Sequence, residues 1–325
     1  MIYVFCHIGA KNPSGGVKIL FEMTQALIDA GHDAAILIPG AHLYPFDCPK
    51  DYKPSWFETT VPVFDDVRIV TENDIVVIHE EGVWAFDHVM VNKPRYMIIN
   101  QGAQSSVANN VGMNITYEYV RSIYQKAMAV ITVSPYISDF VRIAFGVPRF
   151  KIHLIENVID SYFAQTVPKS NNILVMSKSH NLGNELLLKV FAERYNDEWT
   201  TEIINNYSHR ELADAMARSK IFVFMASNSG EGSPMPPIEA AIAGCKVIGN
   251  TGVGGKYYFI EPIFTEVEFN DVTGFIKALD HWTEELRTEP LSGTAANCQR
   301  SILQVDRSLD VYKKRVAEVF SHILG

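Results

Sequence analysis

The chain has 325 residues, of which 47% are hydrophobic and 20% charged, and its net charge at pH 7 is −9. This length accommodates two domains, and the composition is that of an ordinary globular protein. Neither half of the chain is basic, so binding of nucleic acid through its phosphates is not expected. The apolar runs are shorter than a membrane span requires, which leaves at most peripheral contact with a membrane.

Short apolar runs alternate with helical patterns through the first half of the chain. The pattern predicts strands at 2–8, 33–39, 74–80, 95–100 and 129–134 and helices at 17–31 and 134–146. Ser134 is the expected N-cap of the second helix, and Pro135 its first residue. A polar stretch over 161–172 is expected to link two domains.

The same alternation restarts after this stretch. It predicts strands at 172–177, 201–204, 221–226 and 246–250 and helices at 184–195, 208–219 and 236–244. Ser208 and Glu211 have the spacing of a capping box. Two such series predict an α/β protein with two Rossmann-like, doubly wound parallel sheets that face a central cleft. Ligands of such sheets bind beyond the carboxyl ends of the strands.

The segment SGEGSPMPPIEAAIAGCKVI, residues 229–248, carries two glutamates eight residues apart. Pro236 and Pro237 favour a helix start, which places Glu239 in the first turn, where the helix dipole stabilises a carboxylate. An ionised carboxylate accepts two hydrogen bonds at once, which suits a pair of vicinal sugar hydroxyls. Judged on these residues alone, two solvated acids near a helix start explain the pattern as well.

This segment resembles the E-x7-E motif of retaining glycosyltransferases with the GT-B fold, in particular family 4. The likeness continues in YSHRELADAMARSKIFVFMAS, TGVGG, SGGVKILFEMTQALIDAGH, AVITVSPYISDFV and KIHLIENVID, in the family's order. The resemblance implies an acceptor-side domain over 1–160 and a nucleotide-sugar domain over 169–303. It also implies that the last helix, over 306–325, packs back on the first domain, and this segment has the apolar stripe that such packing needs.

The resemblance assigns roles to the residues of this motif. Glu239 is expected to hold the ribose of the nucleotide, and Glu231 to contact the transferred sugar. The backbone amides that face the diphosphate, as at other helix N-termini, are expected at Gly232, Ser233 and Met235. Pro234 stands where the family has a glycine, and it removes one of these amides.

The resemblance also points to a basic residue after strand 172–177. Lys178 stands where the family has the arginine of a basic pair, and it is expected to neutralise the diphosphate. Leu182 or Gly183 stands where the second basic residue would be. Lys256 and Arg210 are the candidates to supply the missing charge.

Glycine loops and a polar strand end complete the expected site. Glycine lets a backbone approach a ligand closely, so Gly15 and Gly16 are expected to face the leaving phosphate or the acceptor, and Gly254 the donor. Asn100 and Gln101 stand where many relatives carry a histidine, and they are expected to hydrogen-bond a sugar hydroxyl without titrating. His79, Glu80 and Glu81 follow strand 74–80 and are further candidates for the acceptor side.

The expected reaction moves a sugar from a nucleoside diphosphate to a hydroxyl of a carbohydrate, lipid-linked or small-molecule acceptor, with retention. No D-x-D pair occurs in the sequence, so neither a metal site nor a cofactor is expected. Two alternatives remain, a nucleotide-sugar epimerase of the same fold and a non-catalytic sugar-nucleotide-binding module. Scattered cysteines and an N-terminus without signal-peptide features favour the cytoplasm, with at most peripheral contact with the inner face of a membrane.

Overall fold

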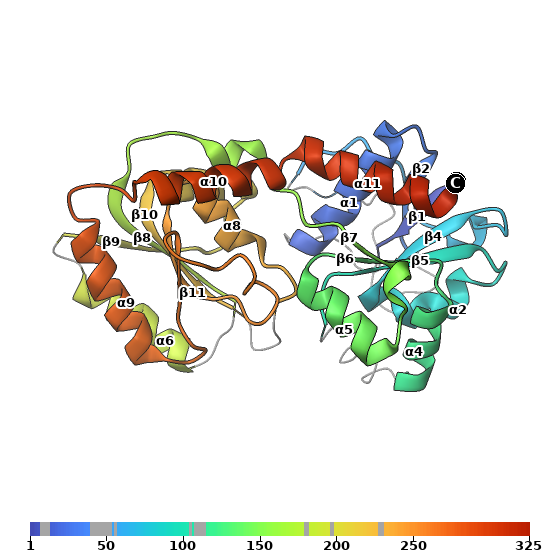
Figure 1. The fold of residues 1–325 in the computed structure, drawn as a ribbon, viewed down its shortest axis with the longest axis horizontal. Coiled ribbons are helices and arrows are strands. Elements are labelled where there is room, and N and C mark those ends of the chain that lie inside the picture. The colour runs from blue at the N-terminus through green and yellow to red at the C-terminus, as the bar shows by residue number, and fades with distance from the viewer. Residues whose placement is uncertain are drawn as a thin grey trace. The chain divides into compact units, whose positions relative to one another are not determined.

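The computed structural model describes residues 1–6, 14–39, 54, 57–103, 106, 115–178, 182–195, 198–226 and 231–325. The chain divides into two compact units. The first comprises Met1–Asn157 and Asp310–Gly325, and the second Val158–Leu309. Each unit is a parallel sheet with helices on both faces (Figure 1).

The first unit contains, in the part of the chain that the structure describes, a seven-stranded sheet of order β3-β2-β1-β4-β5-β6-β7. Its strands are β1 (Ile2–Phe5), β2 (Ala34–Leu37), β3 (Val63–Phe64), β4 (Ile75–His79), β5 (Arg95–Asn100), β6 (Val130–Thr132) and β7 (Ile152–Leu154). Every pairing of neighbouring strands is parallel. The carboxyl ends of the strands therefore lie along one edge of the sheet.

Helices cover both faces of this first sheet (Figure 1). On one face lie α1 (Gly15–Asp29) and the last helix, α11 (Leu309–Leu324). On the other lie α2 (Phe86–Val89), α4 (Tyr117–Lys126) and α5 (Pro135–Phe145). Short 3-10 turns occur at η1 (Val67–Ile69), η2 (Glu80–Ala85) and η3 (Arg149–Lys151). An ion pair of 2.7 Å between Lys313 and Asp29 ties α11 to α1.

The second unit contains, within the described residues, a five-stranded parallel sheet of order β12-β11-β10-β8-β9. Its strands are β8 (Ser170–Ser177), β9 (Thr200–Ile203), β10 (Ser219–Met225), β11 (Lys246–Asn250) and β12 (Phe264–Glu266). Its helices are α6 (Leu182–Arg194), α7 (His209–Arg218), α8 (Met235–Ile242), α9 (Val272–Glu285) and α10 (Thr294–Asp306). Helices α7, α8 and α10 cover one face, and α6 and α9 the other.

The central strand β10 shows why both faces must be covered. Phe222 and Phe224 pack into the core under α7 and α8, whereas Ile221, Val223 and Met225 pack into the core under α6 and α9. Alternate side chains of a strand point to opposite faces, so a continuous apolar strand requires a helical layer on each side. The predicted fold class, two doubly wound parallel sheets in an α/β chain, is confirmed.

Local signals in the sequence set several helix ends. The Ser134 hydroxyl accepts a hydrogen bond from the Ile137 amide, as predicted for an N-cap. The predicted capping box of Ser208 and Glu211 is present at the start of α7. Gly31, with φ +87°, lies just beyond α1, in a conformation that glycine adopts without strain.

Some predicted boundaries differ from the observed ones. Helix α1 begins at Gly15, earlier than the predicted start at residue 17, so Gly15 and Gly16 form its first turn. Residues 161–164, predicted as part of a linker, form a 3-10 turn, η4 (Ser161–Ala164), in the second unit. Phe163 is fully buried in the core of that unit. Its ring anchors the turn because burying a large aromatic side chain is strongly favourable.

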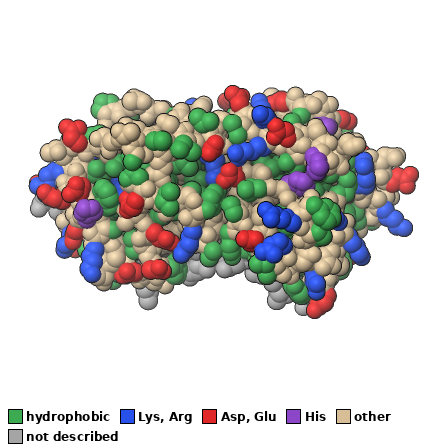
Figure 2. All heavy atoms as spheres, viewed as in Figure 1, with side chains coloured by type: hydrophobic (Ala, Val, Ile, Leu, Met, Phe, Trp, Pro, Cys, Tyr) green, Lys and Arg blue, Asp and Glu red, His purple; other side chains and the backbone are tan. Residues whose placement is uncertain are grey.

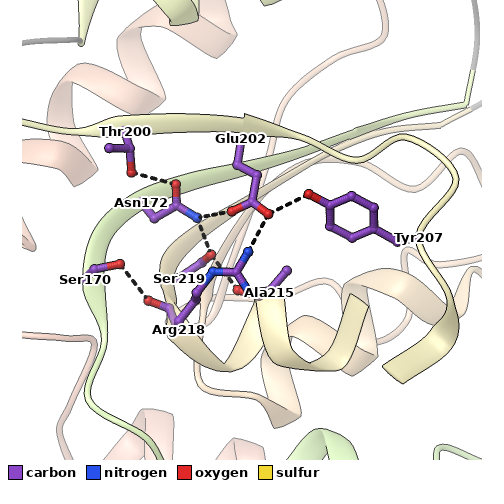
Figure 3. A network of polar contacts seen from close by, with 8 residues as sticks. All are labelled: Ser170, Asn172, Thr200, Glu202, Tyr207, Ala215, Arg218 and Ser219. Carbon is purple, nitrogen blue, oxygen red and sulfur yellow. Dashed lines mark hydrogen bonds and ion pairs between the residues drawn. The ribbon is translucent and has the colours of Figure 1, made fainter. Parts of the chain in front are cut away.

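A polar network joins β8, β9 and the two ends of the α7 segment (Figure 3). The Glu202 carboxylate accepts hydrogen bonds from Tyr207, Arg218 and Asn172 at 2.7, 2.5 and 3.0 Å. The same Asn172 amide also donates to Ser219 at 2.7 Å. The members of this network bond to one another, so we assign it to the stability of the second unit.

The surface carries no dominant charge on the face drawn in Figure 2. Lysine and arginine side chains there are interspersed with aspartate and glutamate side chains. Within the described residues, no helix is both long enough and apolar enough to cross a bilayer.

Candidate active site

The carboxyl edge of the second sheet brings together three segments from the predicted donor site. Lys178 directly follows β8, and its backbone amide donates to the carbonyl of Met225, the last residue of β10, at 2.9 Å. Glu231 follows β10 in the chain, and residues 227–230 between them lie outside the described residues. The loop 251–255 follows β11. Parallel pairing of these strands makes their carboxyl ends neighbours, although the residues are far apart in sequence.

Lys178 and Glu231, both predicted as catalytic, contact each other. The Nζ atom of Lys178 lies 3.3 Å from Oε2 of Glu231 and 5.7 Å from the ring centroid of Phe224. The lysine side chain is 36% exposed and the glutamate side chain 16% exposed. A cation and a partly buried carboxylate thus stand side by side at the carboxyl edge of the sheet, where parallel α/β sheets bind ligands.

Gly254 packs against the backbone of the Glu231 segment. Its amide donates to the Glu231 carbonyl at 3.0 Å. A Cβ atom at Gly254 would lie 2.1 Å from the Glu231 carbonyl oxygen and 2.2 Å from that of Gly232. Only glycine permits so close an approach of two backbones. Gly254, predicted to lie near the donor, is therefore one of the residues that fix the position of Glu231.

Helix α8 begins in a register that differs from the predicted one. Pro234 is its N-cap and Met235 its first residue, so the predicted start at residue 236 is wrong. The hydroxyl of Tyr258 donates to the Pro234 carbonyl at 2.7 Å and anchors this start. Pro236 and Pro237 occupy the second and third positions, where helical amides are otherwise available to a ligand. From 234 to 237, Met235 is thus the one residue with an amide N–H.

Glu239 lies deeper in α8 than predicted. It is the fifth residue of the helix, not part of the first turn, and only 2% of its surface is exposed. Its Oε1 atom lies 3.1 Å from Nε2 of His209, the first residue of α7. The other nitrogen of His209, Nδ1, lies 3.2 Å from Oδ2 of Asp160 and 2.5 Å from the hydroxyl oxygen of Tyr162. Glu239 is thus in contact with His209, whose other ring nitrogen contacts Asp160 and Tyr162 in a further segment.

The sequence prediction missed His209, Asp160 and Tyr162. The capping box correctly marked the start of α7, and with it the position of His209 at the helix N-terminus. No pattern in the sequence relates that helix end to residue 160 or residue 239. Their contact depends on the packing of α7 and α8 against η4, which the order of elements alone does not specify.

At the carboxyl edge of the first sheet, Gln101 links two predicted segments. Its side-chain amide donates to the Gly16 carbonyl at 3.1 Å, and its backbone amide donates to Oε2 of Glu80 at 3.0 Å. Gly15 and Gly16 are the first two residues of α1, where backbone amides lack helical partners and attract anions. Residues 7–13, which connect β1 to this helix start, lie outside the described residues.

His79 and Glu80 form a buried pair beneath Gln101. The His79 Nε2 atom lies 3.0 Å from Oε2 of Glu80, and its Nδ1 accepts from the Glu81 amide at 3.4 Å. Burial opposes a charge on His79, but Glu80 and Glu81 outweigh it and raise the pKa of the imidazole above its usual value. Both side chains are buried inside the unit, so we assign this pair to the support of the Gln101 backbone and not to contact with an acceptor.

Asn100, the last residue of β5, is fully buried. Its side-chain amide donates to the Ser106 hydroxyl at 2.8 Å and to the Tyr124 hydroxyl at 2.7 Å. Both amide hydrogens are thus used inside the unit. The geometry places Asn100 in the packing under the strand end, while Gln101 is partly exposed at the edge itself.

Within the described residues, no group of three or more histidine, cysteine, aspartate or glutamate side chains is arranged to hold a metal ion.

Comparisons with known proteins identify the fold. No protein-family model and no curated protein sequence matches the chain. Among solved structures, HepE from Anabaena in complex with UDP-glucose is similar with a TM-score of 0.69 at 12% identity, over 99% of both chains. Sucrose-phosphate synthase from Thermosynechococcus elongatus and a glycosyltransferase from Rickettsia africae also reach TM-scores of 0.69, at 13% and 16% identity, over 99% of this chain and 98% of theirs. The chain has the GT-B fold of these proteins.

Proposed function

We propose that the protein is a retaining, metal-independent glycosyltransferase similar to family 4, which transfers a sugar from a nucleoside diphosphate to a hydroxyl. The observation that carries this proposal is the Lys178–Glu231 pair at the carboxyl edge of the second sheet, beside the start of α8. A diphosphate needs a cation, and a transferred sugar needs a hydrogen-bond acceptor for its hydroxyls. Lys178 and Glu231 supply these two groups next to each other.

Each group of the second unit takes a part of the donor in this proposal. Lys178 neutralises the diphosphate together with the amides of Gly232, Ser233 and Met235. Glu231 accepts hydrogen bonds from the sugar, and Glu239 from the ribose. UDP-glucose bound to HepE, a protein of the same fold, supports a nucleotide sugar as the donor.

The chemistry requires no protein nucleophile. The bond between the sugar C1 and the diphosphate oxygen breaks, and an oxocarbenium-like state forms. The acceptor oxygen then bonds to C1 on the same face, and its proton passes to the departing phosphate oxygen. Fixed charges that stabilise the diphosphate as it leaves lower the barrier most, which is the role of Lys178. The sequence lacks the D-x-D pair that would hold a divalent metal at the diphosphate, which supports a metal-independent reaction.

The first unit is assigned to the acceptor, a carbohydrate, a lipid-linked sugar or a small molecule. Gln101 stands at the partly exposed edge of its sheet, beside the α1 start with Gly15 and Gly16. The amide of Gln101 hydrogen-bonds hydroxyls without changing its charge. The four cysteines are scattered through the sequence without metal-ligand or CxxC spacing, which supports a cytoplasmic location.

A second candidate function is non-catalytic binding of a sugar nucleotide, and one observation favours it. Prolines at 234, 236 and 237 leave α8 with a single amide N–H over its first residues, where anion-binding helices usually offer several. With the second basic residue of the family also absent, the diphosphate site has fewer donors than the resemblance implies.

Incubation of the protein with a panel of nucleotide sugars separates the candidates. Slow release of free nucleotide indicates a transferase, and interconversion of sugars an epimerase. Stabilisation of the protein without turnover indicates a binding module. In a transferase, Glu231→Ala should lower turnover at least about 100-fold, the usual scale for removing a preorganised polar group, and leave nucleoside diphosphate affinity largely intact. Near-full activity of this variant would contradict the role of Glu231.

A further inference from the structure

The Glu239 carboxylate belongs to a group of four polar side chains in the second unit. The His209 ring lies between Glu239 and Asp160. The Nε2 atom of His209 is 3.1 Å from Oε1 of Glu239, and its Nδ1 atom is 3.2 Å from Oδ2 of Asp160. The Tyr162 hydroxyl lies 2.5 Å from the same Nδ1 atom and 2.6 Å from Oδ2 of Asp160. The Glu239 side chain is 3% exposed, and those of His209 and Asp160 about a fifth exposed, at 18% and 22%. Water therefore screens these contacts poorly.

The hydrogen bonds among these four side chains indicate the protonation of the group. An ionised carboxylate only accepts hydrogen bonds, and a tyrosine hydroxyl has one proton to donate. Tyr162 donates its proton to Asp160, so it can only accept from Nδ1 of His209. Glu239 likewise needs a proton on Nε2. This pattern places a proton on each ring nitrogen, which makes His209 a cation, since imidazole is a stronger base than a carboxylate.

The surrounding charges agree with a cationic ring. Asp160 and Glu239 contribute two negative charges within 3.2 Å, and the phenol of Tyr162 stays neutral because burial and the Asp160 carboxylate raise its pKa. Two features oppose the cation. The Arg210 guanidinium lies 4.2 Å from the Tyr162 ring centroid, and His209 itself occupies the positive N-terminus of α7. Two carboxylates in direct contact outweigh these more distant effects.

Loss of one proton from His209 would break this arrangement. One ring nitrogen would then present a lone pair either to Glu239 or to Tyr162 and Asp160, and that contact would become repulsive. A nearly fully buried carboxylate without a donor is costly, so Glu239 would have to move or take up a proton. In either case it would no longer present an ionised, fixed acceptor to a ribose.

We propose that doubly protonated His209 is a positioning residue that holds the Glu239 carboxylate for the ribose, so that nucleotide affinity falls when His209 loses its proton. This inference rests on the proposed function, because it takes Glu239 as the ribose-binding group. It assigns a role to His209, which touches no substrate, and it makes nucleotide affinity depend on pH. Asp160 and Tyr162 hold the ring from its other nitrogen, Nδ1.

Calorimetric titration with UDP over about pH 7 to 9.5, with GDP and ADP alongside, tests this proposal. The wild-type affinity should fall up to about tenfold per pH unit above the point where the free protein loses the imidazole proton. Titrations in two buffers of different ionisation enthalpy should show uptake of up to about one proton on binding in that range. His209→Gln keeps a donor for Glu239 but cannot titrate, so its proton uptake and its added pH dependence should be lost.

His281→Gln is the matched control. His281 lies in the same unit on α9, beside Trp282 and in the opposite helical layer, so this variant should behave as the wild type. The diphosphate of the ligand also titrates, but it contributes equally to every variant. The difference between variants therefore reports the protein alone. If His209→Gln does not fold, Tyr162→Phe removes the acceptor at Nδ1 and should move the proton uptake to lower pH.

The outcomes separate the two levels of inference. Flat wild-type affinity without proton uptake, or unchanged proton uptake in His209→Gln, would overturn the role of His209 alone. Failure of UDP, GDP and ADP to bind the wild type at any pH would instead overturn the proposed function. A smaller pH dependence for 2′-deoxy-UDP than for UDP would support the proposal that His209 acts through the contact between Glu239 and the ribose.

Discussion

The Nζ atom of Lys178 lies 3.3 Å from Oε2 of Glu231, so the residue expected to bind the diphosphate and the residue expected to bind the sugar are paired with each other. Each neutralises the other at a partly exposed edge, where the pair itself adds little stability. A donor whose diphosphate contacts Lys178 and whose sugar contacts Glu231 would compete with this pair. The pair therefore holds both side chains near their expected positions and is weak enough to be replaced.

Replacing Lys178 should separate diphosphate binding from nucleoside binding. Lys178→Met removes one charge-assisted contact, so the affinity for UDP should fall about 10- to 100-fold, equivalent to ~1.5–3 kcal/mol. The affinity for uridine should be unchanged, which makes uridine the control ligand. Lys178→Arg should restore most of the loss, because a guanidinium also neutralises a phosphate. Equal weakening of UDP and uridine in calorimetric titrations would exclude a diphosphate contact at Lys178.

The sequence predicted most strands of both sheets because their signals are local, but it missed the short edge strands β3 and β12. The continuous apolar run of β10 requires burial on both faces, and the capping box of Ser208 and Glu211 is complete within four residues. The start of α8 was misjudged because proline is compatible with several of the first helical positions. The observed register depends on Tyr258, whose hydroxyl anchors the Pro234 carbonyl from 24 residues away.

The resemblance to a known family predicted part of the candidate site. The resemblance named Lys178, Glu231 and Glu239, and the fold brings the first two into contact. The surroundings of Glu239 could not be derived, because His209 and Asp160 come from segments that meet only through packing. Likewise, adjacent polar residues at the end of β5 looked equivalent in sequence. Asn100 is the last residue of β5 and is buried, whereas Gln101 lies just beyond the strand and is partly exposed.

Replacing Gly254 or Gly16 by alanine has different expected effects, because the added methyl group meets backbone atoms at Gly254 and a side chain at Gly16. Gly254→Ala would bring a methyl group within 2.1 Å of the Glu231 carbonyl oxygen, so the segment carrying Glu231 must shift. We expect loss of turnover and ~1–3 kcal/mol of stability, the usual range for overpacking. In Gly16→Ala the nearest atom is the side-chain Oε1 of Gln101 at 2.9 Å, which can rotate away. Its melting temperature should therefore change less than that of Gly254→Ala, and the reverse order would contradict these contacts.

Glu202 should make the second unit sensitive to acid (Figure 3). Burial opposes its ionisation, but hydrogen bonds from Tyr207, Arg218 and Asn172 outweigh it and hold the pKa below its usual value. A carboxyl with a depressed pKa stabilises the fold above the unfolded-state pKa of about 4.3, and this stability is lost as the pH falls through the folded-state pKa. Glu202→Gln should cost ~1–3 kcal/mol at neutral pH. That difference should shrink below about pH 4.

Urea denaturation of the wild type and Glu202→Gln at several pH values measures this effect. Glu284→Gln is the control, because the Arg287–Glu284 pair in the same unit is exposed, at 49% and 69%, and exposed pairs contribute little. A loss in Glu202→Gln that is constant across pH would show that the carboxylate charge is not the cause.

Asn100 and Gln101 should differ in what their replacement changes, because one faces the interior and the other the sheet edge. Asn100→Ala leaves the buried hydroxyls of Ser106 and Tyr124 without their shared donor, so it should lower stability by ~1–3 kcal/mol. Gln101→Ala removes one contact, to the Gly16 carbonyl, at a partly exposed position, and should leave the melting temperature nearly unchanged. If Gln101 binds a sugar hydroxyl, its loss should raise KM or lower kcat in a folded protein. A fully stable Asn100→Ala variant with lost turnover would instead place Asn100 in direct contact with substrate, as its sequence position first suggested.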